Sequence, residues 1–170
     1  GTVLQEVTSQ LGVDAADILL LNPHTMTLEF SAGRGFRSRA VERTRLRLGQ
    51  GQAGRAALER RIIQHPDFAA SGAAFAQADL LAGEAVASYF AVPLMAKAMV
   101  KGVLEIFHRT PLSPDPEWLN FLESLAGQAA IAIENATLFD GLQRTHFQLS
   151  LAYDATIEGW SRALGLSDPS

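Results

Sequence analysis

The chain has 170 residues, of which 48% are hydrophobic and 19% are charged, and it contains no cysteine. This length and composition predict a globular domain with a core of its own and an appendage. The lack of cysteine excludes disulfides, zinc thiolate centres, a cysteine nucleophile and a thioether-linked chromophore. The net charge of −4 argues against a general nucleic-acid binder.

Membrane and export signals are not predicted by the sequence. No apolar run reaches the roughly 18 residues that a membrane span needs, and no signal peptide opens the chain. A sequence without cysteine fits a reducing compartment. We therefore expect a cytoplasmic protein whose partners include neither a membrane nor nucleic acid.

The first part of the sequence predicts a helix followed by two antiparallel strands. Residues 3–11 place apolar side chains on one helical face, which predicts a short amphipathic helix. Residues 16–22 form an apolar run that predicts a buried strand, and Asn22 with Pro23 predicts a turn. Alternation of apolar and polar residues over 25–33 predicts the second strand of a hairpin.

The middle of the sequence predicts a third strand, a second helix and a loosely structured region. Residues 43–48 alternate arginine with threonine and leucine, which predicts a strand, and residues 51–61 predict a helix. Residues 62–67 predict a short extended piece that Pro66 stops. Residues 69–87 are rich in alanine and glycine and predict a loose helix and loop.

Residues 88–109 predict a second hairpin, because two apolar runs flank a polar turn near residues 96–101. Pro93 lies inside the first of these strands, which favours an edge or a bulge. Apolar residues recur at helical spacing from 117 to about 164, which predicts one long helix or two joined near Gly141. The element order predicts an α+β fold with a central antiparallel sheet, flanking helices and a long C-terminal helix.

Residues 49–54, GQGQAG, fit the G-x-G-x-x-G pattern of a dinucleotide-binding turn. The strand before them carries arginine at every second position, whereas a dinucleotide-binding strand is buried on both faces. An acidic residue at the end of a second strand, about 20 residues on, is also missing. We interpret the glycines as a tight strand-to-helix turn that allows close packing of the following helix.

No catalytic residue and no metal site is predicted, because the histidines and serines lack the spacing of metal ligands or nucleophiles. The arginines between residues 34 and 47 form either a solvated hairpin face or an anion site. Glu105 interrupts an apolar strand, so its carboxylate must face water or find a partner. Solvent is the favoured interpretation, and a polar contact in a ligand pocket is the alternative.

Three segments together resemble the GAF domain family. LGQGQAGRAALERRIIQHPD (48–67) resembles the glycine-rich turn, helix and short strand of that family. ASYFAVPLMAKAMVKGVLEIF (87–107) resembles its hairpin, and LESLAGQAAIAIENATLF (122–139) resembles its closing helix. The segments occur in the order and spacing of the family, so we predict a GAF domain over residues 1–140.

This resemblance implies a non-catalytic regulatory domain that holds a small molecule between the sheet and the 68–90 region. The chain has no cysteine for a bilin, and the asparagine–lysine–phenylalanine–aspartate signature of the cyclic-nucleotide-binding type is not visible. No cofactor is therefore predicted, and the small-molecule ligand stays unknown. The predicted pocket combines aromatic walls, a carboxylate and anion contacts: Phe68, Phe75, Tyr89, Glu105, Arg37 and Arg39.

The tail LAYDATIEGWSRALGLSDPS (151–170) resembles the start of an HD-GYP phosphodiesterase domain. It implies that residues 141–170 form a signalling helix leading into a truncated domain of that type. The enzyme, a metal-dependent cyclic dinucleotide phosphodiesterase, would then lie further along a longer bacterial signalling protein.

An apolar stripe along the same tail needs a partner. We predict a homodimer through the N- and C-terminal helices, with packing of the stripe on its own domain as the alternative. The predicted dimer helix carries Leu142, Leu149, Tyr153 and Trp160.

Two other functions compete with a ligand-sensing domain. A stand-alone enzyme on a GAF-like fold, such as a methionine sulfoxide reductase, uses cysteines that this chain lacks. A purely structural dimerisation module without a ligand has nearly the same sequence features. A cavity filled by side chains favours that module, and a roomy cavity with convergent polar groups favours ligand sensing.

Overall fold

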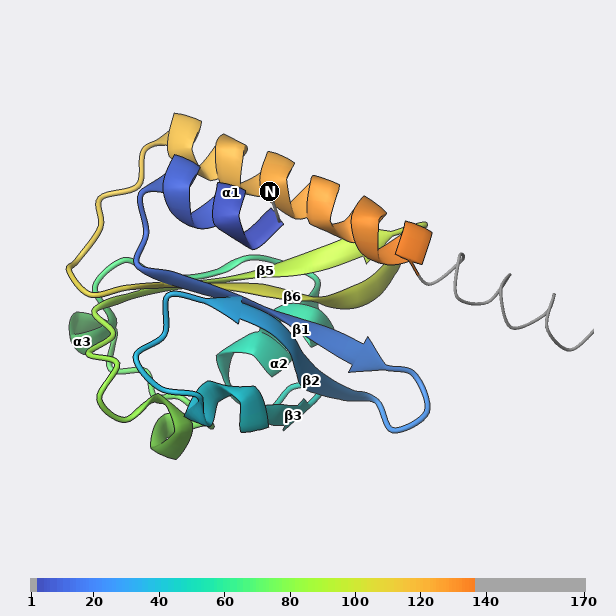
Figure 1. Cartoon of the computed structure of the whole chain (residues 1–170), viewed down its shortest axis with the longest axis horizontal. Helices are drawn as coiled ribbons and strands as arrows, with labels where there is room; N and C mark the ends of the chain where they lie inside the picture. Colours follow the sequence, from blue (N-terminus) through green and yellow to red (C-terminus); the bar gives the residue numbers. More distant parts are fainter. Residues whose placement is uncertain (1–2, 137–170) are drawn as a thin grey trace, which may run out of the picture. The chain divides into compact units, whose positions relative to one another are not determined.

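A six-stranded antiparallel sheet with the strand order β3-β2-β1-β6-β5-β4 forms the centre of the computed structural model, which describes residues 3–136 (Figure 1). Every neighbouring pair of strands is antiparallel, which confirms the predicted α+β architecture. The strands are β1 (Ala15–Asn22), β2 (Thr27–Arg34), β3 (Arg45–Arg47), β4 (Ile63–His65), β5 (Ser88–Ala96) and β6 (Met99–His108).

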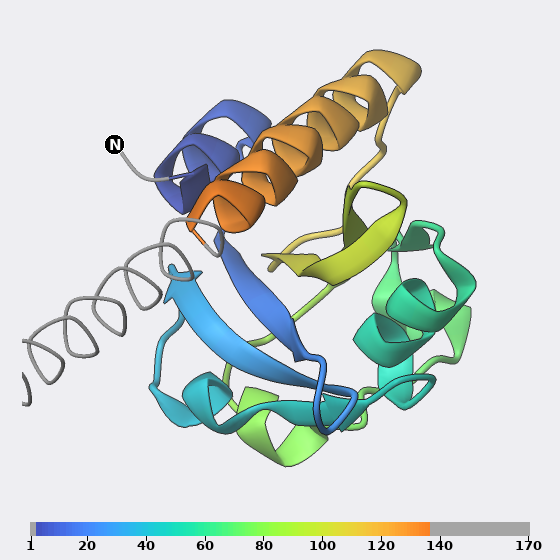
Figure 2. The same ribbon diagram turned by 90° about the vertical axis from the view of Figure 1, so that its right-hand side faces the viewer.

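Helices cover both faces of this sheet (Figures 1 and 2). One face carries α1 (Val3–Leu11) and, beside it, residues 116–132 of a C-terminal helix that continues to residue 136. The opposite face carries α2 (Gly51–Glu59), α3 (Phe68–Ser71) and the short helices η1 (Ala40–Arg43) and η2 (Ala78–Leu81).

The chain divides after Ala132 into two compact units, and the whole sheet belongs to the first. The C-terminal helix begins at Pro116, one residue before its predicted start. The predicted dimer helix and the segment 141–170 lie outside the described residues, so those predictions stay predictions.

The face under α1 and the C-terminal helix is held by apolar and aromatic contacts. Leu4, Val7 and Leu11 are the buried residues of α1, as the helical spacing predicts. Trp118 packs on Phe90 of β5 with ring centroids 4.9 Å apart. The Trp118 indole Nε1 donates a hydrogen bond of 3.1 Å to the backbone oxygen of Leu11, which ties the two helices together.

The opposite face has a core of its own beneath α2 and η2. Its centre is aliphatic toward β3 and α2 and aromatic toward α3. A rim of half-buried apolar side chains, including Phe30, Phe36, Phe68 and Phe75, packs against this core. The fully buried members are Ala15, Leu19, Leu28, Val41, Leu46, Ala53, Ala56, Ala57, Ile63, Leu81, Tyr89, Ala91, Val103 and Phe107.

The glycine-rich turn between β3 and α2 has the structural role that the sequence indicates. Gly51 has φ of +64°, a conformation that side chains with a Cβ rarely adopt. A Cβ on Gly54 would lie 2.6 Å from the backbone oxygen of Arg47, so only glycine allows α2 to approach β3 this closely. The motif is thus explained by backbone geometry and close packing.

Pro93 occupies a place in the sheet where its missing N–H does no harm. β4 pairs with β5 only from Tyr89 to Ala91, so β5 has become an edge by the time it reaches Pro93. A register shift between Leu94 and Met95 follows immediately. The strand therefore shows the two features that a proline in a sheet favours, an edge position and a neighbouring bulge.

Candidate functional site

Two carboxyl side chains face each other in the middle of the sheet. Asp17 of β1 and Glu105 of β6 are register partners in the antiparallel ladder. Both side chains are 0% exposed. Asp17 lies two residues from Leu19, and Glu105 two from Phe107, and both of these belong to the core beneath α2. This carboxyl pair therefore lies on the α2 and α3 face of the sheet.

Tyr89 and Gln77 supply hydrogen bonds to one side of the carboxyl pair. The Tyr89 hydroxyl on β5 donates to Oε2 of Glu105, and Nε2 of Gln77, the residue before η2, donates to the same oxygen at 3.4 Å. Four buried acceptor atoms have no hydrogen-bond partner among the described residues: Oδ1 and Oδ2 of Asp17, Oε1 of Glu105 and Oε1 of Gln77. The cluster is rich in acceptors and short of donors.

The protonation of the carboxyl pair follows from this shortage. Burial raises the pKa of Asp17 well above its ordinary value, and the neighbouring Glu105 charge raises it further. Burial also raises the pKa of Glu105, against the opposing effect of hydrogen bonds from Asp17, Tyr89 and Gln77. Two ionised carboxylates offer no proton to each other, whereas a protonated Asp17 can donate to Glu105. The pair therefore holds a proton in its favoured state.

Aromatic rings cover the carboxyl pair. Phe68 and Phe75 stack with centroids 4.3 Å apart and an interplanar angle of 9°. Phe75 also packs edge-on against Tyr89 at 4.9 Å, and Tyr89 packs against Phe107 at 5.2 Å. The rings thus extend outward from Tyr89, the hydrogen-bond partner of Glu105, and the outermost of them, Phe68 and Phe75, are half-buried.

Comparison with known proteins identifies the family. A family model described as the GAF domain matches residues 1–134. The chain belongs to the GAF domain family. No curated protein matches it.

Solved GAF domains share the fold of this one. The GAF domain of an Acinetobacter phosphoenolpyruvate-protein phosphotransferase has 21% identity and a TM-score of 0.68, with 81% of each chain covered. The GAF domain of a Bacillus halodurans two-component sensor histidine kinase has 23% identity and a TM-score of 0.67, over 81% of this chain and 95% of that one. The second GAF domain of DevS from Mycobacterium smegmatis has 20% identity and a TM-score of 0.65, over 82% and 94%.

The GAF domain brings four of the six predicted pocket residues together. Phe68, Phe75 and Tyr89 are in mutual ring contact, and Tyr89 is bonded to Glu105. The expectation that Glu105 faces solvent was wrong, because β6 is a central strand and other elements cover both faces of the sheet there, leaving Glu105 0% exposed. A carboxylate on β6 therefore finds its partners inside the core.

Arg37 and Arg39 lie elsewhere, in the exposed loop between β2 and η1. Nη1 of Arg37 donates to the backbone oxygen of Gly83 at 3.0 Å, and Arg39 lines a shallow hollow beside β2. Among the described residues, neither side chain forms a hydrogen bond or ion pair with the carboxyl pair. Their predicted role as anion contacts stays a prediction.

Sequence reasoning missed Asp17 and Gln77. Asp17 stands inside the apolar run 15–21, and a carboxylate in such a run is the same signal that drew attention to Glu105. Gln77 lies in the alanine-rich region without any local pattern. Only the fold, which places η2 over β6, brings its amide to Glu105.

A second buried carboxylate, Glu84, belongs to a clamp at the end of the sheet. It accepts hydrogen bonds from the backbone N–H groups of Arg37 and Ser38 at 2.9–3.1 Å. Nη2 of Arg109 adds a charged bond of 3.0 Å, and Nε of Arg109 bonds the Glu84 backbone oxygen at 2.9 Å. This Glu84 clamp fastens two loops to the strand end and leaves the carboxylate fully partnered.

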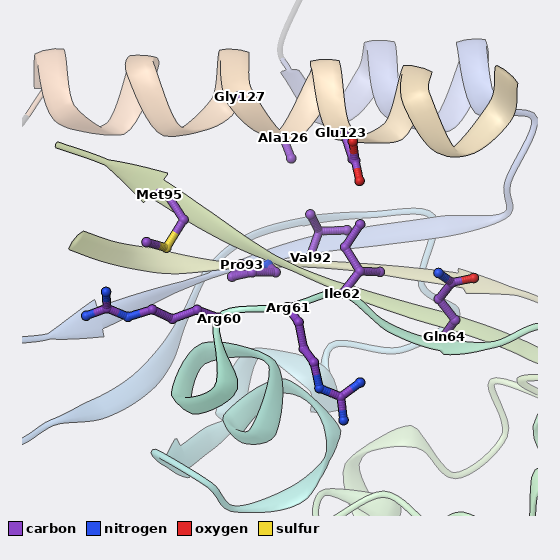
Figure 3. A pocket seen from close by; sticks show the side chains of 10 residues that line it. All are labelled: Arg60, Arg61, Ile62, Gln64, Val92, Pro93, Met95, Glu123, Ala126 and Gly127. Atoms are coloured by element: carbon purple, nitrogen blue, oxygen red, sulfur yellow. The ribbon is translucent and has the colours of Figure 1, made fainter. Parts of the chain in front are cut away.

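An open groove lies on the other face, between β5 and the C-terminal helix (Figure 3). Its charged groups sit at the surface, and Arg61 is already paired with Glu59 at 3.0 Å. The groove lacks a buried polar group that would fix a ligand. Its lining comprises Arg60, Arg61, Ile62, Gln64, Val92, Pro93, Met95, Glu123, Ala126 and Gly127.

Residues 3–136 carry neither a cluster of metal-ligating side chains nor a membrane-spanning helix. Within that range no group of three or more histidine, cysteine, aspartate or glutamate side chains is arranged to hold a metal ion. None of the helices described is both long enough and apolar enough to cross a bilayer.

Proposed function

We propose that this GAF domain is a non-catalytic regulatory module of a cytoplasmic bacterial signalling protein. It senses a small molecule on the α2 and α3 face and controls a C-terminal output domain. The observation that carries the proposal is the carboxyl pair with its acceptor-rich surroundings beneath an aromatic cover. The proposed regulatory role is supported by solved structures of the same fold, which come from a sensor histidine kinase and a phosphotransferase.

The output domain in this proposal is an HD-GYP phosphodiesterase, and the support is the resemblance of residues 151–170 to the start of such a domain. The domain acts as a homodimer through its N- and C-terminal helices. A heptad-like stripe can transmit a small rotation from a sensor to the domain that follows it.

Native mass spectrometry of the freshly purified longer protein tests the sensing function. We expect a mass increment from a bound small molecule and a dimeric stoichiometry. Deleting residues 1–140 should change the output activity, because the regulatory input is removed. An output that is identical with and without these residues contradicts a regulatory role. A monomer by light scattering at high micromolar concentration contradicts the dimer.

A structural dimerisation module without a ligand is the second candidate. The packed stack of Phe68 and Phe75 over Tyr89 favours it, because these rings already fill the space above the sheet. Under this alternative the longer protein carries no bound molecule, while deletion of the domain still disrupts the dimer. The two candidates therefore differ in the mass measurement and agree in the light-scattering one.

A further inference from the structure

We propose that the carboxyl pair, together with Oε1 of Gln77, is a binding site for an organic ammonium group. This inference rests on the proposed sensing function and names the chemical class of its ligand. The site lies between β1, β5, β6 and η2, and its contacts come from Asp17, Glu105, Tyr89 and Gln77.

The first argument is the balance of donors and acceptors. Asp17, Glu105 and Gln77 are 0%, 0% and 5% exposed, and when both carboxyls are ionised they present four acceptor oxygens without a donor among the described residues. An acceptor buried without a donor costs about 1–3 kcal/mol in proteins. A ligand that relieves this cost must donate several hydrogen bonds, and an anion would worsen the repulsion. An ammonium group provides up to three donors and the matching charge.

The second argument concerns the surroundings of the carboxyl pair. The rings of Phe75, Tyr89 and Phe107 pack against one another next to it, with centroids 4.9 to 6.1 Å apart. Aromatic faces attract organic cations through cation–π interactions. A hydrated metal ion gains no comparable attraction from these rings. Calcium and magnesium require about six oxygen ligands, whereas this cluster offers two carboxyl groups and one amide. The chemistry selects an amine over a metal.

Within residues 3–136, no cation is among the groups that shift the pKa of Asp17 or Glu105. Its strand neighbour Tyr89 and the covering Gln77 are uncharged donors. His65 on β4 approaches Tyr89 with ring centroids 6.4 Å apart. Burial and the nearby charge of Arg55 lower the pKa of His65, which favours its neutral form. Each element packed around the pair therefore leaves its negative charge for a ligand or a proton to balance.

Access to the site requires the covering segment to move. This cover segment, residues 66–81, has only Gln77 and Leu81 buried, and α3 within it has no buried residue at all. Segments with so few buried contacts open at a small fraction of the global unfolding free energy. Lifting Phe68 and Phe75 removes the outer rings and uncovers Tyr89. The cover segment is thus the entrance that an amine would use.

Binding of the ammonium group must displace the proton that the carboxyl pair holds. Because burial raises the pKa values of Asp17 and Glu105, protons and amine compete for the same oxygens. If one proton leaves for each amine bound, affinity rises about tenfold per pH unit up to the pKa of the site. A structural water site would show no such competition.

An NMR titration of the full chain with methylammonium chloride and tetramethylammonium chloride tests the site. We expect saturable amide shifts centred on β1, β5 and β6, with an affinity that increases with pH as the carboxyl pair loses its proton. Sodium chloride and sodium acetate at equal concentration should give no saturable shift. Absence of saturation for both amines at pH 8 overturns the inference.

Variants of the carboxyl pair test which side chains bind the amine. D17N, alone and combined with E105Q, should abolish the saturable shifts, and both replacements keep the side-chain shape. E29Q is the matched control, because Glu29 is a surface carboxylate of β2. Binding that survives in D17N with E105Q places the amine elsewhere and overturns the site.

These results are separable from those that test the proposed function. If the output of the longer protein depends on residues 1–140 but neither amine binds, the regulatory function stands and the ammonium site fails. If both amines bind in the manner described and the output is independent of the domain, the site stands and the regulatory function fails.

Discussion

The Glu84 clamp and the carboxyl pair are both buried, but their surroundings differ. Glu84 is 2% exposed and accepts bonds from two backbone N–H groups and the Arg109 guanidinium. Asp17 is 0% exposed, and neither of its oxygens has a donor among the described residues unless the carboxyl pair holds a proton. The first arrangement stabilises the fold, and the second destabilises it until a proton or a ligand arrives. Both carboxylates are almost equally buried, so the number of hydrogen-bond donors around each one distinguishes a structural group from a candidate binding group.

The largest effect should come from breaking the clamp. E84A leaves the N–H groups of Arg37 and Ser38 and the charge of Arg109 without their acceptor. We expect a loss of about 3–5 kcal/mol in the free energy of unfolding, as for other broken buried ion pairs. Urea denaturation measures it. A loss below about 1 kcal/mol would mean that solvent replaces the carboxylate and that the clamp is not structural.

At the carboxyl pair, by contrast, we expect a substitution to increase the free energy of unfolding. D17N supplies an amide donor to Glu105 and removes a buried ionisable group, so the variant should be about 1–2 kcal/mol more stable than the parent near pH 8. The pH dependence is fixed by the raised pKa of Asp17. The stabilisation from its raised pKa is fully present below the ordinary value of 3.8 and is lost as the pH rises from that value to the folded-state pKa.

The advantage of D17N should therefore grow from pH 4 to pH 8, by no more than about 1.4 kcal/mol per pH unit. Urea denaturation of both proteins across this pH range measures the difference between their free energies of unfolding. The contributions of the other titrating groups are common to both proteins and cancel in this difference. A variant that is less stable than the parent at every pH would show that Asp17 has favourable partners and would remove the contrast with Glu84.

A smaller effect is expected from Y89F. Phenylalanine keeps the ring packing against Phe75 and Phe107 but removes the hydroxyl donor to Glu105. We expect a loss of about 1 kcal/mol in the free energy of unfolding. The loss should be reduced when D17N is introduced as well, because the new amide offers Glu105 another donor. Additive losses in the double variant would show that the two side chains act independently.

The smallest effect should come from E29Q, which sets the scale for a carboxylate on the surface. The Glu29 side chain is 41% exposed and lies 3.7 Å from Nε of Arg45. Exposed pairs of this kind contribute about 0–1 kcal/mol, so thermal unfolding should shift little. A large shift would indicate that charge on β2 matters more than burial and would weaken the comparison.

Much of the fold could be predicted because local patterns determine it. Residues 3–11 form a helix with the predicted bounds, and both hairpins occur where apolar alternation and turn residues indicate them. The cover segment was the least defined, since alanine and glycine carry little pattern. Its short helix and its η2 turn depend on contacts with the sheet, such as the bond from Gln77 to Glu105.

The candidate site was harder to predict, because its members meet only through tertiary structure. Phe68, Phe75 and Tyr89 were placed together by family resemblance. Glu105 was recognised as unusual, but strand alternation could not tell which face of β6 would be covered. Its partner Asp17 comes from the far end of the chain through the β1 and β6 pairing. Register between strands distant in sequence is not encoded in any local pattern.

The arginines of β3 have a consequence for the outer boundary of the sheet. β3 and β4 are the two edge strands, and each has only three residues, Arg45–Arg47 and Ile63–His65. Long, flat and uncharged edges invite further strands and promote aggregation. Here one edge is short and carries exposed guanidinium groups on either side of Leu46. The stripe that argues against a dinucleotide fold thus protects the folded domain against edge-to-edge polymerisation.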